Sequence, residues 1–169
     1  MKDKETATLA GGCFWCTEAI FKRVKGVESV TPGYSGSEHT ECLQIKFDPK
    51  TVTYLKLLEI FFKTHDPASY DKQGADTGPQ YRSIVFYQNN SQKEEVEKLI
   101  KKFDEEKVFN GKIVTEVKPF TNFYEAESYH KNFYEKNKDN PYCTIVINPK
   151  LEKLYKEFGS EDVLQSNYE

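Results

Sequence analysis

The chain has 169 residues, and its 24 basic and 27 acidic side chains leave a net charge of −3. This length suits one compact domain over residues 1–169, and the near balance of charge excludes a general attraction to nucleic acid or to anionic membranes. No apolar run approaches the roughly 18 residues that a membrane span needs, and the start "MKDKETATLAGG" lacks the apolar stretch of a signal peptide. We expect a cytoplasmic, monomeric protein whose substrates are small molecules or other proteins.

The first half of the chain predicts two strands and two helices. Residues 6–12, "TATLAGG", form a strand that two glycines end, and the apolar spacing of residues 13–24 predicts a helix that begins at Cys13. The alternation in residues 43–48 predicts a second strand with one buried face. The next helix ends at "THDP", and its apolar stripe is Tyr54, Leu57, Leu58 and Phe61.

The second half predicts a strand over residues 82–88, then a long helix that Ser91 and Glu94 begin with capping-box spacing. A short strand over residues 112–117 follows, and the last helix has Pro149 in its first turn. The apolar stripes of these two helices are Val96, Leu99, Ile100 and Phe103, and Leu151, Leu154, Tyr155 and Phe158. Helices mixed with antiparallel-looking strands predict an α+β, two-layer sandwich.

Four cysteines in a chain expected in a reducing compartment are more typical of catalysis or metal binding than of structural disulfides. Cys13 lies at a predicted helix N-terminus, where the helix dipole and unpaired N–H groups favour a thiolate, so it is the better nucleophile. Cys16, one turn further along, stays within reach of a disulfide. Packing in the core is the alternative for both thiols, and for Phe14 and Trp15 between them.

Two other chemistries could use the same cysteine pair. The spacing of a zinc site is found in four residues, Cys13, Cys16, His39 and Cys42. A zinc-stabilised binding module is therefore one alternative, although the apolar patterning is sufficient for folding without metal. A thioredoxin-like dithiol oxidoreductase is the other, although the bulky Phe-Trp pair between the cysteines would obstruct a docking protein disulfide.

Two segments that we expect to be loops concentrate polar and aromatic side chains. "PGYSGSEHTE" carries Tyr34 and places Glu41 just before a predicted strand. "ADTGPQYRS" precedes another strand and carries Asp76, Gln80, Tyr81 and Arg82. Each residue alone fits ordinary packing or a turn, but together with Cys13 they indicate a site made of a thiolate, an acid and phenol donors.

The order and spacing of six motifs resemble those of the class A peptide methionine sulfoxide reductases over about residues 5–155. The motifs are "GGCFWCTEAIF", "PGYSG", "HTE", "DTGPQYRS", "YEAESYH" and "NPYC". The resemblance implies thiol-dependent reduction of the S epimer of methionine sulfoxide, free or in proteins, with no cofactor and no metal. It also implies an α+β fold around a mixed β-sheet, in which we expect a ferredoxin-like core.

The resemblance further implies a role for individual side chains. Cys13 would be the nucleophile, and Glu41 would be the acid that protonates the sulfoxide oxygen. Five more residues would complete the site: Phe14 and Trp15 as the wall for the substrate's S-methyl group, Tyr34 and Tyr81 as phenol donors, and Asp76 beside them.

The chemistry explains why these groups would be needed together. A sulfoxide sulfur is a poor electrophile until its oxygen is protonated or strongly hydrogen-bonded, and a desolvated carboxyl can stay protonated near neutral pH. Attack by Cys13 would release methionine and leave a sulfenic acid, which a second thiol converts to a disulfide that a thioredoxin-like reductant restores. Cys16 shares the helix turn and Cys143 lies in "NPYC", so these two are the leading candidates for the second thiol. Cys42 and an external thiol are the remaining alternatives.

Overall fold

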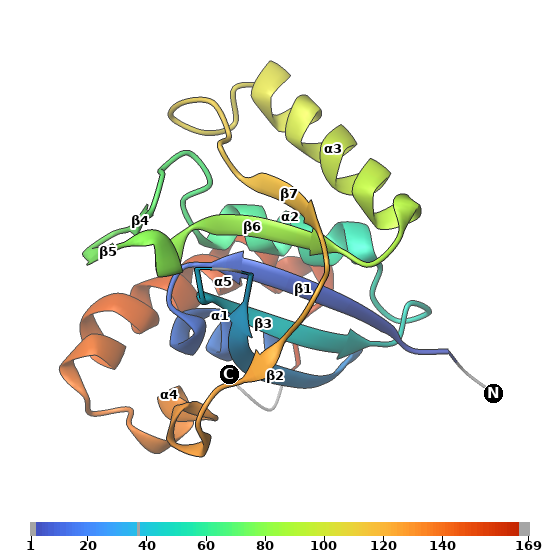
Figure 1. Cartoon of the computed structure of the whole chain (residues 1–169). Helices are drawn as coiled ribbons and strands as arrows, with labels where there is room; N and C mark the ends of the chain where they lie inside the picture. The colour runs from blue at the N-terminus through green and yellow to red at the C-terminus, as the bar shows by residue number, and fades with distance from the viewer. Residues whose placement is uncertain (1–2, 37, 166–169) are drawn as a thin grey trace.

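The structure, a computed structural model, describes residues 3–36 and 38–165. Within them, six strands form one sheet in the order β7-β6-β1-β3-β2-β8 (Figure 1). Its strands are β1 (Glu5–Gly11), β2 (Val27–Ser35), β3 (Thr40–Phe47), β6 (Ser83–Tyr87), β7 (Glu116–Pro119) and β8 (Tyr124–Glu125). The pair β6–β7 is parallel and the other pairs are antiparallel. The expected α+β fold around a mixed sheet is therefore confirmed.

Five α-helices and several shorter elements complete the described part of the chain. The helices are α1 (Phe14–Phe21), α2 (Tyr54–Thr64), α3 (Asn90–Glu105), α4 (Phe133–Lys136) and α5 (Asn148–Phe158). A small hairpin, β4 (Lys72–Gln73) and β5 (Asp76–Thr77), leads into the 3-10 turn Pro79–Tyr81, and a second 3-10 turn spans Ser128–His130. A π-helical stretch, Cys143–Ile147, runs directly into α5.

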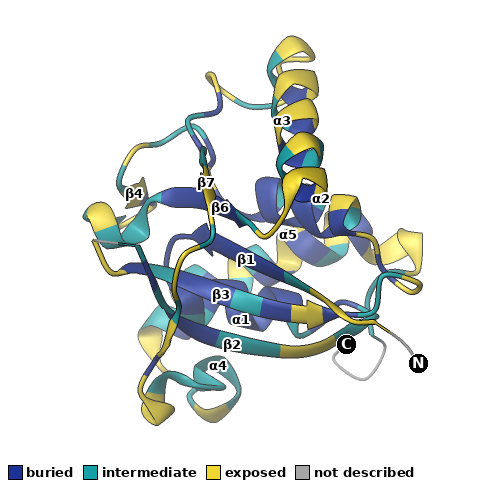
Figure 2. Cartoon of the chain, turned by 45° about the vertical axis from the view of Figure 1, so that its right-hand side comes forward, coloured by how far each residue is buried: buried dark blue, intermediate teal, exposed yellow. Residues whose placement is uncertain are grey.

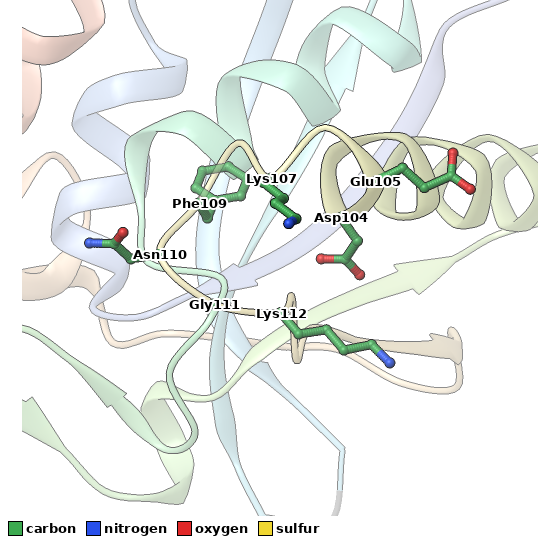
Figure 3. A pocket seen from close by; sticks show the side chains of 7 residues that line it. All are labelled: Asp104, Glu105, Lys107, Phe109, Asn110, Gly111 and Lys112. Carbon is green, nitrogen blue, oxygen red and sulfur yellow. The ribbon is translucent and has the colours of Figure 1, made fainter.

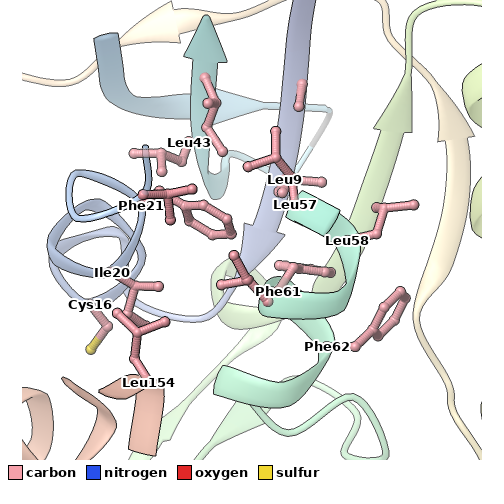
Figure 4. Close-up of a cluster of buried hydrophobic side chains, with 14 of the residues drawn as sticks. Leu9, Cys16, Ile20, Phe21, Leu43, Leu57, Leu58, Phe61, Phe62 and Leu154 are labelled. Atoms are coloured by element: carbon pink, nitrogen blue, oxygen red, sulfur yellow. The ribbon is translucent and has the colours of Figure 1, made fainter. Parts of the chain in front are cut away.

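The main hydrophobic core lies between one face of the sheet and helices α1, α2 and α5 (Figures 1 and 2). Alternating side chains of the strands supply one side of the core, because successive residues of a strand point to opposite faces. The helices supply the other side through stripes at helical spacing. The labelled members in Figure 4 are Leu9, Cys16, Ile20, Phe21, Leu43, Leu57, Leu58, Phe61, Phe62 and Leu154.

The segment between β7 and β8 crosses the opposite face of the sheet from one edge to the other (Figure 1). Its Phe120 and Phe123 cover a second, smaller cluster of Ala10, Cys42, Ile84 and Phe86. Gly33 on β2 permits this close crossing, because a Cβ there would lie 2.4 Å from Phe123 Cζ and from the Tyr124 carbonyl oxygen.

Strand β2 was not expected from the sequence. Pro32 lacks an N–H group and Gly33 lacks a side chain to pack, so the local signal for a strand is weak. Pairing with β3 nevertheless runs from Val27 to Ser35. The prediction that "PGYSGSEHTE" is a loop is therefore wrong at both ends, since Tyr34 lies in β2 and Glu41 lies inside β3.

The helix boundaries differ in detail from the sequence expectation. Helix α1 ends at Phe21 rather than continuing to residue 24. The capping box of α3 is wrong: Asn89 caps the helix, and its side chain accepts a hydrogen bond from the Gln92 N–H at 2.9 Å. Helix α5 has Pro149 in its first turn, as expected.

Strand β7 begins later than predicted, at Glu116 rather than at residue 112. The preceding residues use their N–H groups elsewhere: Ile113 donates to the Asp104 carboxylate at 2.9 Å, and Val114 donates to the Pro67 carbonyl at 2.8 Å. A periodic pattern cannot reveal such a competing partner.

Among the described helices, none has both the length and the apolar character that a membrane span requires.

Candidate active site

The turn between β1 and α1 places the first cysteine. Gly12 has φ 94°, and a Cβ on it would lie 2.6 Å from Gln73 Cγ, so both the backbone conformation and the space require glycine. The turn makes Cys13 the N-cap residue of α1, and the Cys13 carbonyl accepts the Cys16 N–H at 3.0 Å. The expected position of Cys13 at a helix N-terminus is confirmed.

The two thiols of this turn differ in exposure and in ionisation. Cys13 is 7% exposed, whereas Cys16 is 0% exposed and packs in the main core. The Cys13 thiol donates a hydrogen bond to the Cys16 sulfur, which lowers the pKa of Cys16 to about 7. The same hydrogen bond, followed by burial and the nearby charges of Cys16 and Glu41, raises the pKa of Cys13. The two thiols therefore titrate as a coupled pair, in which the shifts favour a thiolate on Cys16 over one on Cys13 while both groups are free of substrate.

Glu41 lies beside the cysteine turn, on the helix-covered face of β3. Its Oε1 accepts the Phe14 N–H at 3.2 Å, so the carboxyl is hydrogen-bonded to the first residue of α1. Burial is the main cause that raises the pKa of Glu41 to about 7, and the negative charges of Asp76 and Cys16 add to it. A carboxyl with this pKa holds its proton in about half of the molecules at neutral pH. It can therefore act as an acid there.

A residue that the sequence analysis did not select connects the thiols to Asp76. The Tyr142 hydroxyl donates to Asp76 Oδ2 and lies 3.6 Å from Cys16 Sγ. It also hydrogen-bonds the Cys13 thiol, which lowers the pKa of Cys13 slightly against the larger opposing effects. The sequence signal for this residue is its place in "NPYC", directly before Cys143.

Aromatic side chains enclose the half-buried Trp15. Its ring stacks on Phe133 with centroids 3.7 Å apart, and its Nε1 donates to His130 Nδ1 at 2.9 Å. The buried Phe14 ring meets Tyr34 edge-on, with centroids 5.4 Å apart. His130 lies in "YEAESYH", a motif noted in the sequence without a role for its histidine. This aromatic group follows Cys13 in the chain, and it adjoins Glu41 through the Phe14 N–H.

The two tyrosines expected as donors are not equivalent. Tyr34 donates its hydroxyl proton to Glu127 Oε1 at 3.1 Å, and burial with that hydrogen bond raises its pKa to about 12. Tyr81 lies near the reacting groups: after burial, the charges of Glu41, Asp76 and Cys13 raise its pKa. Among the described residues, Tyr81 donates to no carboxylate, whereas Tyr34 does.

The remaining candidates separate into near and distant groups. Cys143 is buried, and the charge of Cys16 contributes to its raised pKa, so it lies close to the pair. Cys42 packs in the cluster on the opposite face of the sheet, where burial raises its pKa. The four cysteine and histidine residues of a zinc site are therefore not brought together, and the described residues hold no group of three or more ligands placed for a metal.

Arg82, which lies next to Tyr81 in sequence, is directed away from the thiols. Its guanidinium forms ion pairs with Asp71 at 2.7 Å, Glu38 at 3.1 Å and Glu116 at 3.3 Å. These contacts tie the β4–β5 region to the sheet edge. Arg82 therefore has a structural role in this geometry.

A surface hollow elsewhere on the molecule lacks the groups for this chemistry. It lies at the C-terminal end of α3 and the following loop (Figure 3). Its lining residues are Asp104, Glu105, Lys107, Phe109, Asn110, Gly111 and Lys112. The lining contains neither a thiol nor an imidazole, so the cysteine turn remains the candidate site for thiol chemistry.

Comparison with known proteins agrees with the geometry. Residues 5–162 match the family described as peptide methionine sulfoxide reductase. The chain belongs to this family. Peptide methionine sulfoxide reductase MsrA from Sulfolobus acidocaldarius is 52% identical over an alignment 169 residues long. The alignment covers 91% of this chain and 95% of that relative. The protein is accordingly an oxidoreductase, a thiol-dependent methionine sulfoxide reductase.

Solved structures of peptide methionine sulfoxide reductases share the fold. Reduced Mxr1 from Saccharomyces cerevisiae matches with a TM-score of 0.78 and 29% identity, over 85% of this chain and 92% of the yeast chain. The structure of Mxr1 in complex with Trx2 matches with a TM-score of 0.61 and 28% identity, over 75% of this chain and 86% of that chain.

Proposed function

We propose that this reductase acts on the S epimer of methionine sulfoxide, free or in proteins, with Cys13 as nucleophile and Glu41 as acid. The observation that carries the proposal is the pairing of the more accessible thiol with a buried carboxyl whose pKa is raised to about 7. The S epimer follows from the resemblance of the motifs to those of class A enzymes. Trp15 and Phe14 supply the apolar wall for the S-methyl group.

The first step transfers the sulfoxide oxygen to Cys13. The shared proton moves to Cys16, the Cys13 thiolate attacks the sulfoxide, and Glu41 gives a proton to its oxygen. The oxygen ends on Cys13 as a sulfenic acid, and methionine leaves with the electron pair that the Cys13 sulfur supplied. Tyr81 polarises the oxygen as a second donor, Tyr34 contributes less while Glu127 holds its proton, and Asp76 raises the pKa of Glu41.

Cys16 then forms a disulfide with Cys13 and releases the oxygen as water. Its support is the direct hydrogen bond between the two thiols within one helix turn. Cys143 is the second candidate, because it is close to Cys16 but buried in the π-helical stretch. Cys42 is excluded as a direct partner by its place on the opposite face of the sheet.

The reductant that restores the dithiol is of the thioredoxin type. The yeast relative in complex with Trx2 supports this class of partner. We take the chain as one domain over residues 1–169 and as a cytoplasmic monomer, without cofactor or metal. The strand order β6-β1-β3-β2, with α1 after β1 and α2 after β3, supports a ferredoxin-like core at its centre.

Mass mapping after one turnover tests the proposed chemistry. Reduced protein mixed with one equivalent of the S epimer should yield one equivalent of methionine and a Cys13–Cys16 disulfide. The R epimer in the same assay is the control and should yield little methionine. A Cys13–Cys143 disulfide would transfer the recycling role to Cys143, and absence of methionine from the S epimer would refute the function.

A further inference from the structure

A single phenol hydroxyl contacts the two thiols and a carboxylate. Tyr142 Oη lies 3.6 Å from Cys16 Sγ, hydrogen-bonds the Cys13 thiol and donates to Asp76 Oδ2. Its ring meets Trp15 edge-on, with centroids 5.5 Å apart. The hydroxyl therefore sits at the junction between the sulfur pair and the acidic hairpin β4–β5.

A phenol has one proton to donate and lone pairs that accept. When Tyr142 donates to Asp76, its oxygen can accept the proton of a neighbouring thiol at the same time. Cys16 is 0% exposed, so solvent does not reach its sulfur to remove that proton. For Cys13 to attack as a thiolate, the shared proton must sit on Cys16. Cys16 must lose it again before a disulfide can form.

We propose that Tyr142 carries the Cys16 proton to Asp76 while Cys16 attacks the Cys13 sulfenic acid. This inference rests on the function proposed above. The Cys16 sulfur supplies the electron pair of the new S–S bond, and the S–O bond of the sulfenic acid breaks. The Cys16 proton passes to the Tyr142 oxygen as the Tyr142 proton passes to Asp76. The oxygen leaves as water with a proton from Glu41, which solvent reprotonates after methionine has left.

Tyr142→Phe removes the relay and keeps the ring that packs on Trp15. In single-turnover experiments, methionine formation should fall by less than about threefold, whereas disulfide formation slows by roughly 10²-fold, the low end of a proton-transfer contribution. The sulfenic acid should then accumulate and be trapped by dimedone. Methionine is measured by chromatography, and the disulfide by rapid alkylation and mass spectrometry.

Tyr134→Phe is the matched control. The Tyr134 hydroxyl donates to Asn148, away from the thiols. The substitution therefore removes a phenol hydroxyl, as Tyr142→Phe does, but outside the site. Both steps should keep their wild-type rates in this variant. Asp76→Asn provides a second variant, since an amide oxygen still accepts the Tyr142 hydrogen bond but does not take up a proton. It should slow disulfide formation as Tyr142→Phe does, although its loss of charge beside Glu41 also affects the first step.

The outcomes separate this inference from the function on which it rests. Wild type that forms no methionine refutes both. Wild type that forms methionine and the Cys13–Cys16 disulfide, together with a Tyr142→Phe protein that forms the disulfide equally fast, overturns the relay alone. Equal slowing of both steps in Tyr142→Phe also overturns it, because that would indicate general support of the pocket. An Asp76→Asn protein with unchanged disulfide formation would remove Asp76 as the proton acceptor.

Discussion

Glu41 and Cys42 are neighbours on β3 and point to opposite faces of the sheet. Burial is the first cause of the raised pKa of both groups. For Glu41 this yields an acid with a pKa of about 7, beside a thiol pair and an aromatic wall. For Cys42 it yields an inert thiol within a cluster covered by Phe120 and Phe123. Burial thus makes Glu41 a usable acid on one face of the sheet and keeps the Cys42 thiol protonated, and so unreactive, on the other.

Cys16 and Cys42 allow the effect of burial on pKa to be compared between two thiols. Both are buried, yet the pKa of Cys16 is lowered to about 7, first by the hydrogen bond from Cys13, then by the positive charge of Lys150 and by the hydrogen bond with Tyr142. Within the described part of the chain no such donor acts on Cys42, and burial dominates the shift of its pKa. Donors and a positive charge near the sulfur, rather than exposure alone, separate a reactive thiol from a structural one.

The same substitution on the two faces should give the largest contrast. Cys13→Ser should lower methionine sulfoxide reduction by more than about 10³-fold, as removal of a covalent nucleophile does. Cys42→Ser should keep the activity and lose about 1–3 kcal/mol of unfolding free energy, because a hydroxyl replaces a buried thiol. Steady-state assays and urea unfolding of both variants measure this. Retained activity in a folded Cys13→Ser protein would assign the nucleophile to another thiol.

Substitution of the acid, Glu41, should have the next largest effect on the rate. Glu41→Gln keeps the shape and a hydrogen-bonding side chain but cannot transfer a proton, so the sulfoxide step should slow by roughly 10²- to 10⁴-fold. Since the acid form of Glu41 declines above its pKa of about 7, the wild-type rate of this step should fall as pH rises past that value. Alkylation of Cys13, which needs no acid, is the control and should change little. A variant as fast as wild type would show that the proton comes from another group.

Stability should report the same carboxyl independently of catalysis. The folded pKa of Glu41 is raised from 4.5 to about 7, so its stabilising effect is full below 4.5 and is lost as pH rises through 7. Above both values, the charged carboxyl costs the folded state about 3 kcal/mol. Glu41→Gln should therefore unfold at higher urea than wild type at pH 9, with a smaller difference at pH 4. If wild type and Glu41→Gln differed in urea midpoint by the same amount at pH 9 and at pH 4, the assignment of Glu41 as a buried acid would be contradicted.

The two tyrosines should give the smallest effects, and unequal ones. Tyr81→Phe should slow the sulfoxide step by about tenfold and Tyr34→Phe by about twofold, within the range for loss of one hydrogen bond. The reason is that Tyr34 already donates to Glu127, whereas Tyr81 lies near Cys13 and Glu41. Single-turnover rates of the two variants decide the order. An equal or larger loss for Tyr34→Phe would mean that its hydroxyl leaves Glu127 when substrate binds.

Local sequence patterns were sufficient for part of the fold and part of the site. The alternation of Leu43, Ile45 and Phe47 predicted β3, and the glycine pair before Cys13 predicted the strand-to-helix turn. Strand β2 escaped because Pro32 and Gly33 weaken its own propensity while its pairing comes from β3. The site residues came mainly from family motifs, and those motifs left the donors around the thiols unassigned.

The sequence by itself determined the residue types, their order along the chain and the periods that build the sheet and its helices. Only the tertiary structure decided which thiol has its pKa lowered, which tyrosine donates to a carboxylate and which phenol interacts with both sulfurs. Tyr142 is 126 residues from Cys16 and 66 from Asp76 in the chain. Periodicity reports neighbours within a few residues, whereas contacts of this separation, and the pKa values that depend on them, arise only when the core packs the distant segments together.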